Sequence, residues 1–168
     1  MKKKSFITIF LFAITAIALI MSCRKNEISP TDTALYEEIM DTSNFVYSTL
    51  TPTIVKGLAN SPRGWERIRF NKIAFSALDN NGRLPRGSVF PDGSIIVKEA
   101  YTASNGSLYQ YAVMKKDKNN KFEKKGWLWS EIETNGFASY AVSMKGKKCI
   151  NCHTRPDDID ATRTFVLR

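Results

Sequence analysis

The chain has 168 residues, a formal net charge of +9 and 43% hydrophobic residues. This length fits one ordinary domain and argues against a multidomain protein. The densest basic run, "MKKDKNNKFEKKG" at residues 114–126, is interrupted by acidic residues and asparagines. We interpret it as a solvated loop between two strands, so nucleic acid is not an expected partner.

The first 22 residues are typical of an export signal. Lys2 to Lys4 form a basic head, and an unbroken run of apolar and small residues follows from Phe6 to Met21. Ile20–Cys23 resembles a bacterial lipobox in which Ser22 is the last residue removed, leaving Cys23 as a lipidated N-terminus. An uncleaved anchor is the alternative, because the run is close to the lower limit of about 17 residues for a membrane span. Both interpretations place the domain on the periplasmic side of a bacterial membrane.

A tether and a helix are expected next. Residues 24–32, "RKNEISPTD", are polar and lack apolar periodicity, so we expect a tether over residues 23–33 and the folded domain over 34–168. A helix is predicted from Ala34 to Leu50 with Asp32 or Thr33 as its N-cap. Three apolar residues at helical spacing support it: Leu35, Ile39 and Val46.

The rest of the domain is dominated by strand signals. Arg67–Phe70 alternates as in a strand, and Asn71 can cap a short helix that runs to Leu78. Further on, three segments are rich in strand formers: residues 94–103, 107–116 and 126–133. "NG" at residues 105 and 106 predicts a two-residue hairpin turn between the first two. The fold class is therefore α+β, with an antiparallel β-sheet and flanking helices.

The motif "CINCH", residues 149–153, holds two of the three cysteines and the single histidine. It is the attachment pattern of a c-type haem. Two thiols three residues apart, Cys149 and Cys152, can form thioethers to both vinyl groups of one porphyrin. The adjacent His153 is then placed to bind the iron. We therefore expect one covalently attached haem c, with His153 as the metal ligand.

Three other interpretations of this motif are weaker. A thioredoxin-like Cys-x-x-Cys should open a helix after a buried parallel strand, whereas this one follows an antiparallel segment near the C-terminus. A zinc site needs four ligands, and the sequence offers no further histidine and no cysteine beyond Cys23. A plain disulfide would not need the adjacent histidine. Export also agrees with haem attachment, because c-type maturation in bacteria takes place outside the cytoplasm.

The opposite axial position of the haem iron has few candidate ligands. Methionine is the other usual ligand, and three remain after the signal: Met40, Met114 and Met144. Met144 is close in sequence to the haem cysteines, and core packing is the expected role of Met40 and Met114. An open position is therefore favoured, which indicates binding or catalysis rather than simple electron transfer.

The second half of the chain resembles the cytochrome P-460 family, which also includes cytochrome c′-beta. The resemblance covers residues 90–165 and rests on five segments: "FPDGSIIVKEAY" (90–101), "YAVMKKD" (111–117), "GWLW" (126–129), "CINCH" and "DATRTF" (160–165). It implies an antiparallel sheet that holds a five-coordinate haem. Lys98 stands where some members link a strand lysine covalently to the porphyrin, and these members oxidise hydroxylamine with the help of a distal carboxylate. Other members bind nitric oxide or carbon monoxide.

The predicted hairpin register bears on which of these activities applies. If Asn105 and Gly106 form the turn, Lys98 and Tyr111 lie on one face of the hairpin and Glu99 on the other. Tyr111 resembles the position of the catalytic carboxylate in the family. A phenol donates hydrogen bonds but is a poor base near neutral pH, which counts against hydroxylamine oxidation. Lys98 has an ordinary alternative role, as a strand lysine that extends to water.

Three functions therefore stay open. They are a hydroxylamine-oxidising oxidoreductase, a haem protein that binds nitric oxide or another gas, and an electron-transfer cytochrome with a sixth ligand. The expected partners are a small nitrogen-containing or gaseous ligand, membrane lipid through Cys23, a redox partner cytochrome and a second copy of the chain in a homodimer.

Overall fold

One antiparallel sheet forms the centre of the computed structural model, which describes residues 29–57, 61 and 63–162. Its strand order is β1-β3-β4-β5-β6-β7, and β2 pairs with β3 at the edge. The strands are β1 (Phe45–Tyr47), β2 (Val55–Lys56), β3 (Trp65–Asn71), β4 (Ile95–Tyr101), β5 (Leu108–Lys116), β6 (Trp127–Glu133) and β7 (Ala138–Tyr140). The predicted fold class is confirmed, as are the three predicted strands of the second half.

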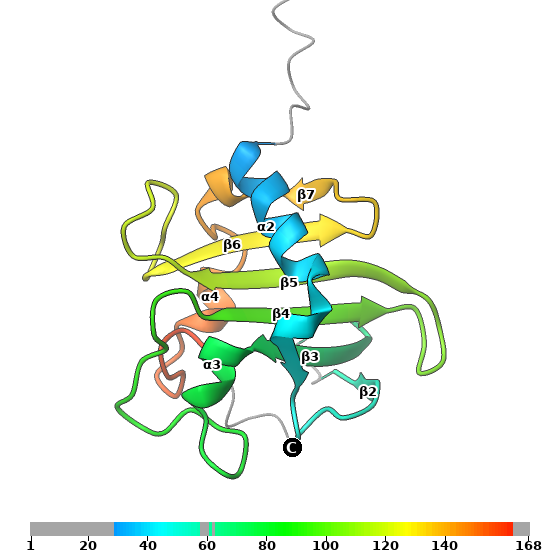
Figure 1. Ribbon diagram of the computed structural model, residues 1–168, viewed down its shortest axis with the longest axis horizontal. Coiled ribbons are helices and arrows are strands. Elements are labelled where there is room, and N and C mark those ends of the chain that lie inside the picture. Colours follow the sequence, from blue (N-terminus) through cyan, green and yellow to red (C-terminus); the bar gives the residue numbers. More distant parts are fainter. Residues whose placement is uncertain (1–28, 58–60, 62, 163–168) are drawn as a thin grey trace, which may run out of the picture.

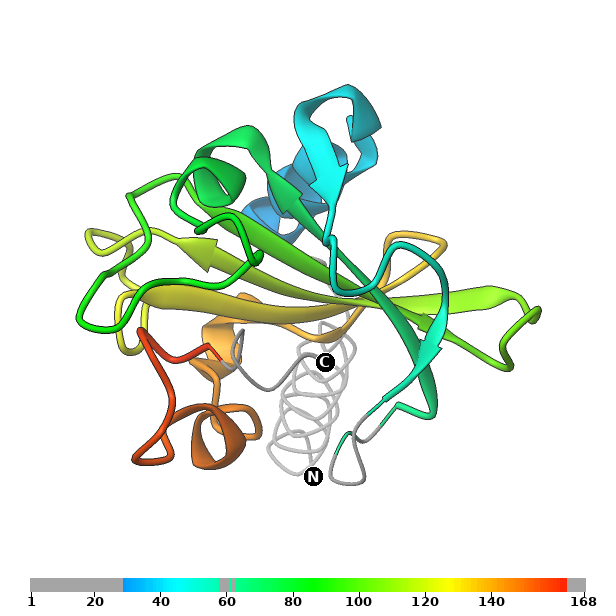
Figure 2. The same ribbon diagram turned by 90° about the horizontal axis from the view of Figure 1, so that it is seen from below.

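Helices cover both faces of this sheet. They are α2 (Pro30–Met40), α3 (Lys72–Ser76), α4 (Ile150–His153) and two 3-10 turns, η1 (Thr42–Asn44) and η2 (Val142–Met144). Helix α2 crosses in front of the strands in Figure 1, and α4 lies behind them. Figure 2 shows the two helices on opposite sides of the sheet. We call these sides the α2 face and the α4 face.

Helix α2 differs from its prediction at both ends. It begins at Pro30 and is capped by Ser29, whose hydroxyl accepts a hydrogen bond from the Asp32 amide, so neither Asp32 nor Thr33 is the cap. Pro30 suits the first helical turn because its missing amide hydrogen has no helical partner there. The helix ends at Met40, because residues 45–47 pair with β3 instead. The predicted tether of residues 23–33 therefore overlaps the folded domain.

Asp32 links this helix to the sheet. Its side chain is fully buried, and its Oδ1 accepts hydrogen bonds from the Ser130 hydroxyl at 3.1 Å and from the Val142 amide at 3.0 Å. Ser29 donates to Oδ2 at 2.5 Å. A buried carboxylate needs this degree of hydrogen bonding to be tolerated. The start of α2 is thus fixed to β6 and η2.

The β3–α3 segment agrees with its prediction. The Asn71 side chain accepts a hydrogen bond from the Ala74 amide at 2.9 Å and so caps α3, as expected, although α3 ends at Ser76 rather than Leu78. Asn71 also donates to the Gly93 carbonyl and accepts from the Ile95 amide. The cap therefore joins α3 to the start of β4.

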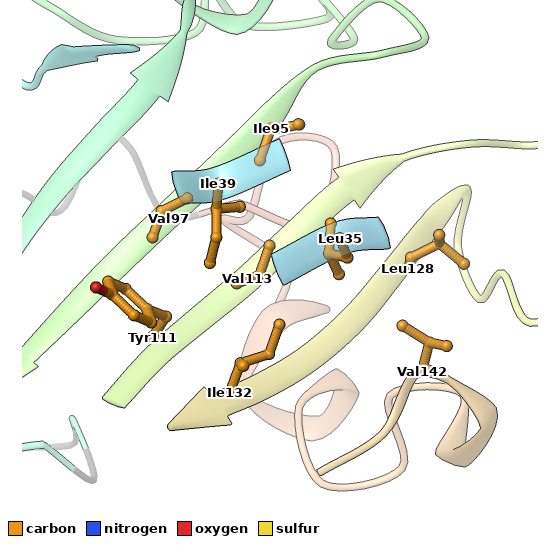
Figure 3. Close-up of a cluster of buried hydrophobic side chains, with 9 residues drawn as sticks. All are labelled: Leu35, Ile39, Ile95, Val97, Tyr111, Val113, Leu128, Ile132 and Val142. Atoms are coloured by element: carbon orange, nitrogen blue, oxygen red, sulfur yellow. The ribbon is translucent and has the colours of Figure 1, made fainter. Parts of the chain in front are cut away.

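Two buried clusters lie on the two faces of the sheet. The α2-face cluster, drawn in Figure 3, consists of Leu35, Ile39, Ile95, Val97, Tyr111, Val113, Leu128, Ile132 and Val142. The second cluster consists of Ile68, Phe70, Ala74, Leu84, Phe90, Met114, Trp127 and Trp129, and Cys149 and Ile150 pack against it. Trp127 and Trp129 are both almost fully buried in this second cluster.

The predicted signal, residues 1–22, and the lipidation site Cys23 lie outside the described residues. Within the part of the chain that the structure describes, no helix is long and apolar enough to cross a membrane.

Candidate haem site

Helix α4 is held close to the sheet by the turn before it. Gly146 has φ +64°, and a β-carbon there would come within 2.7 Å of the Trp129 ring. Only glycine fits both the backbone conformation and this close approach. The Gly146 carbonyl accepts hydrogen bonds from the Cys149 and Ile150 amides at 2.8 and 3.0 Å. The first turn of α4 therefore starts directly against β6.

This short helix brings the three residues of the attachment motif together on the α4 face. Cys149 is half-buried against the second cluster, Cys152 is exposed, and neither forms a disulfide. His153 packs edge-on against Trp129, with ring centroids 5.2 Å apart. The structure thus places two thiols and one imidazole on a single helical turn beside the sheet.

The His153 ring is oriented by a backbone carbonyl. Its Nδ1 lies 2.9 Å from the Ala161 oxygen. Because a carbonyl only accepts hydrogen bonds, Nδ1 carries the hydrogen, and the neutral ring has its lone pair on Nε2. Histidines that bind metals are commonly held in this way, with the second nitrogen donating to a carbonyl or carboxylate. The tautomer that this hydrogen bond requires therefore suits metal binding through Nε2.

The environment of Cys149 does not resemble that of a redox-active thiol. Burial, together with the Glu131 carboxylate, raises the pKa of the Cys149 thiol to about 11, and Arg63 opposes the shift. Reactive Cys-x-x-Cys motifs lower the pKa of a cysteine to form a thiolate. The thioredoxin-like interpretation is therefore disfavoured. Among the described residues, no group of three or more histidine, cysteine or carboxylate side chains has an arrangement that could hold a metal ion by itself.

This shift predicts slow, pH-dependent alkylation of Cys149 in protein made without haem. In a Cys152→Ser background, the rate with iodoacetamide should keep rising up to about pH 11. The same shift lowers the stability of the fold at high pH. Between the ordinary pKa of 9.0 and the raised value of about 11, the folded thiol keeps its proton and the unfolded thiol loses it. The free energy of unfolding therefore falls as the pH rises through that interval. A half-maximal rate near pH 7 would contradict this environment.

The α4 face of the sheet changes from apolar to polar along its strands. One row across β3–β6 contains Phe70, Ile96, Met114 and Trp129. The next two rows contain Ile68, Lys98, Ala112 and Glu131, and then Glu66, Ala100, Gln110 and Glu133. His153 packs on the apolar row through Trp129. A flat apolar ligand with a polar edge would match this gradient.

Lys98 lies on this face, as the interpretation of the site requires. Its Nζ is 3.0 Å from Oε2 of Glu66, a carboxylate that is only 2% exposed and also accepts a hydrogen bond from Ser61 at 2.8 Å. Lys98 itself is 30% exposed, so its amine lies at the edge of the site rather than in bulk water. Sequence reasoning did not single out Glu66. The alternation of Glu66 with Ile68 and Phe70 could have placed it on the same face.

Tyr111 does not lie near Lys98, and the predicted hairpin register is wrong. The loop is closed by backbone hydrogen bonds from the Thr102 amide to the Ser107 carbonyl and from the Gly106 amide to the Ala103 carbonyl, and the β4–β5 pairing has a bulge between Ala100 and Tyr101, just before the loop. The turn is therefore longer than two residues, and Lys98 pairs with Ala112 while Glu99 pairs with Tyr111. A register change of one residue moves a side chain to the opposite face.

Tyr111 instead belongs to the α2-face cluster, between Val97 and Ile132 in Figure 3. Burial raises the pKa of its phenol, so even less of the basic phenolate form exists near neutral pH. Glu99 shares this face and forms an ion pair with Arg69 at 2.9 Å. The prediction that Glu99 faces away from Lys98 is thus confirmed. The predicted role of Tyr111 at the haem is not supported by its position.

Of the three methionines in the described residues, one is buried and two are exposed. Met114 is buried in the second cluster, in the same row as Trp129, so its predicted core role is confirmed. Met40 is exposed at the end of α2, so its predicted core role is wrong. Met144 is exposed in η2.

These observations define a class of protein: an antiparallel sheet with a Cys-x-x-Cys-His helix packed on one face is suited to bind haem. The sequence matches the family described as Cytochrome P460 over residues 41–164, and the chain belongs to this family. It is therefore a haem-binding cytochrome of that kind. No curated protein matches the chain.

Proposed function

We propose that this cytochrome is an exported mono-haem protein that binds a small nitrogen-containing ligand, nitric oxide above all, at a five-coordinate iron. Cys149 and Cys152 attach the haem through thioethers, and His153 is the proximal ligand. The chain contains one Cys-x-x-Cys-His and one histidine, which supports a single haem. When bound, the haem supplies an iron that takes up the ligand and exchanges electrons.

The orientation of His153 is the observation that carries this proposal. The Ala161 carbonyl fixes the hydrogen on Nδ1 and leaves the lone pair on Nε2. Trp129 supports the ring from the side, at 5.2 Å between centroids. Both contacts fix the ring with Nε2 available as the donor atom for the iron.

The thiol environment fits covalent attachment. Each thioether forms when a Cys sulfur adds to one carbon of a vinyl group and its hydrogen goes to the other carbon, so the product carries no charge. The half-buried Cys149 site disfavours the thiolate, as its raised pKa shows, but accommodates a neutral sulfur. Cys152 is exposed and accessible to the maturation machinery.

The positions of the methionines support an open sixth position. Met40 ends α2 on the opposite face of the sheet, and the Met144 side chain is exposed. Met114 is already packed among Trp127, Trp129 and their neighbours. Within the described residues, no second histidine exists to act in their place.

Hydroxylamine oxidation is a second candidate, and Glu66 is the observation that favours it. Tyr111 cannot supply the carboxylate that this activity needs, but Glu66 lies beside Lys98 on the α4 face. A carboxylate there can accept a proton from a bound substrate. Lys98 is the residue that would link to the porphyrin edge in this case.

One visible spectrum of the reduced, haem-loaded protein separates these candidates. Nitric oxide binding without a lysine link predicts an ordinary five-coordinate spectrum that changes when the gas is added. A strongly red-shifted, broadened Soret band indicates the Lys98 link and favours the oxidase, which hydroxylamine turnover then tests. Sharp low-spin bands in the protein alone would contradict both candidates and indicate an electron carrier.

The location and partners are part of the same proposal. The signal-like residues 1–22 and the lipobox-like residues 20–23 support export and a lipid at Cys23. A periplasmic cytochrome of this kind would exchange electrons with a partner cytochrome, and a homodimer is a further expectation.

Cys23→Ser is expected to release the protein from membranes, since it removes the acylated thiol. Fractionation of cells that produce each form measures this. A variant that stays with the membrane fraction would favour an uncleaved anchor.

A further inference from the structure

A tight turn after α4 has an unusual backbone. Ile159 and Thr162 exchange two backbone hydrogen bonds, at 3.1 and 2.9 Å. The two residues between them, Asp160 and Ala161, have φ of +48° and +59°. Such values are uncommon outside glycine, and consecutive ones persist only where surrounding contacts hold them. This turn overlaps the start of "DATRTF" (160–165), the segment that ends the family resemblance.

Three elements hold Asp160 in place. Its carboxylate forms an ion pair with Nζ of Lys116 on β5, and both side chains are buried, at 7% and 3% exposure. The Phe90 amide donates to Oδ2 at 2.8 Å. The indole of Trp127 on β6 donates to the Asp160 carbonyl at 3.0 Å. The strained turn is therefore fixed to two central strands and to the segment before β4.

The residue after Asp160 orients the proximal histidine. The Ala161 carbonyl receives the Nδ1 hydrogen of His153 at 2.9 Å. We propose that the Lys116–Asp160 ion pair is a positioning device for His153: by fixing the 159–162 turn, it sets the hydrogen bond at Nδ1 and hence how strongly Nε2 donates to the iron. This inference rests on the proposed ligation of haem by His153.

The neighbouring lysine provides a matched contrast. Lys115 points to the α2 face and pairs with Glu38 of α2 at 2.5 Å, and these two side chains are 27% and 38% exposed. Lys115 carries the same charge as Lys116 and lies on the same strand, but its side chain is on the opposite face of the sheet from the Lys116–Asp160 pair. Replacing Lys115 should therefore leave His153 undisturbed.

The experiment compares four haem-loaded variants with the wild type: Lys116→Met, Asp160→Asn, the double variant with both changes, and the control Lys115→Met. Resonance Raman spectroscopy of the reduced protein gives the iron–histidine stretching frequency, and a redox titration gives the reduction potential. A weaker hydrogen bond at Nδ1 makes Nε2 a weaker donor, which lowers the frequency and raises the potential.

The two single variants separate positioning from a direct effect of charge. Loss of the Asp160 charge acting directly on the iron would raise the potential, and loss of the Lys116 charge would lower it. Loosening of the turn raises the potential in both and lowers the stretching frequency in both. We expect this second pattern, with Lys115→Met unchanged.

The double variant keeps the test decisive if a single variant does not fold, because it leaves no unpaired buried charge. A lowered frequency and a raised potential in the double variant support the inference. Haem content equal to that of the wild type with an unchanged frequency overturns the inference and leaves the proposed function standing. A wild type without haem overturns the proposed function, and this inference with it.

Discussion

Asp32→Ala is expected to lower the free energy of unfolding by about 2–3 kcal/mol. The change leaves the buried Val142 amide without its acceptor, and an unsatisfied buried group costs about 1–3 kcal/mol. It also removes one of the two oxygens within reach of the Ser130 hydroxyl, which keeps the Tyr140 carbonyl as an acceptor. The side chain is fully buried, so water cannot replace the carboxylate easily. Urea denaturation followed by circular dichroism measures the difference.

Asp41→Ala is the matched control at the other end of α2. Asp41 is exposed, and its side chain accepts a hydrogen bond only from the exposed Ser43 hydroxyl among the contacts of the described residues. Its loss should change the free energy of unfolding by about 0.5 kcal/mol or less. Equal effects of the two changes would contradict the role of Asp32 as the link between α2, β6 and η2.

Lys98→Leu is expected to change the visible spectrum of the haem-loaded protein, whereas Tyr111→Phe should not. Lys98 lies on the α4 face, so its removal either abolishes a link to the porphyrin or makes the polar edge of the site apolar. Tyr111 lies in the α2-face cluster, with the sheet between it and α4. The Soret and visible bands of both variants, with and without nitric oxide, give the comparison.

Glu66→Gln complements this pair, because it removes the charge beside Lys98 but keeps the size of the side chain. It should alter the spectrum if Lys98 contacts the haem edge. A spectrum that changes in Tyr111→Phe but not in Lys98→Leu or Glu66→Gln would indicate haem on the α2 face and contradict a site on the α4 face.

The sequence was a good guide where local chemistry decides the structure. The Asn71 cap depends on a side chain and an amide three residues apart, and the strands of the second half depend on composition and on turns. The motif of residues 149–153 carries its own spacing, so it identified the candidate haem site without the fold.

The pairing of residues far apart in the chain could not be predicted from the sequence. The helix predicted to Leu50 stops at Met40 because Phe45–Tyr47 gains hydrogen bonds from β3, which no local pattern reveals. The hairpin register failed through a longer loop and one bulge, and this alone moved Tyr111 to the wrong face. Glu66 and Lys116 acquire their roles only from partners 32 and 44 residues away, Lys98 and Asp160.

The covalent bonds of haem to Cys149 and Cys152 can be tested by the intact mass, under denaturing conditions, of protein produced in a host with c-type maturation machinery. We expect the mass of one added haem, lost when both cysteines are replaced with serine. An unmodified mass for the wild type from that host would contradict covalent attachment.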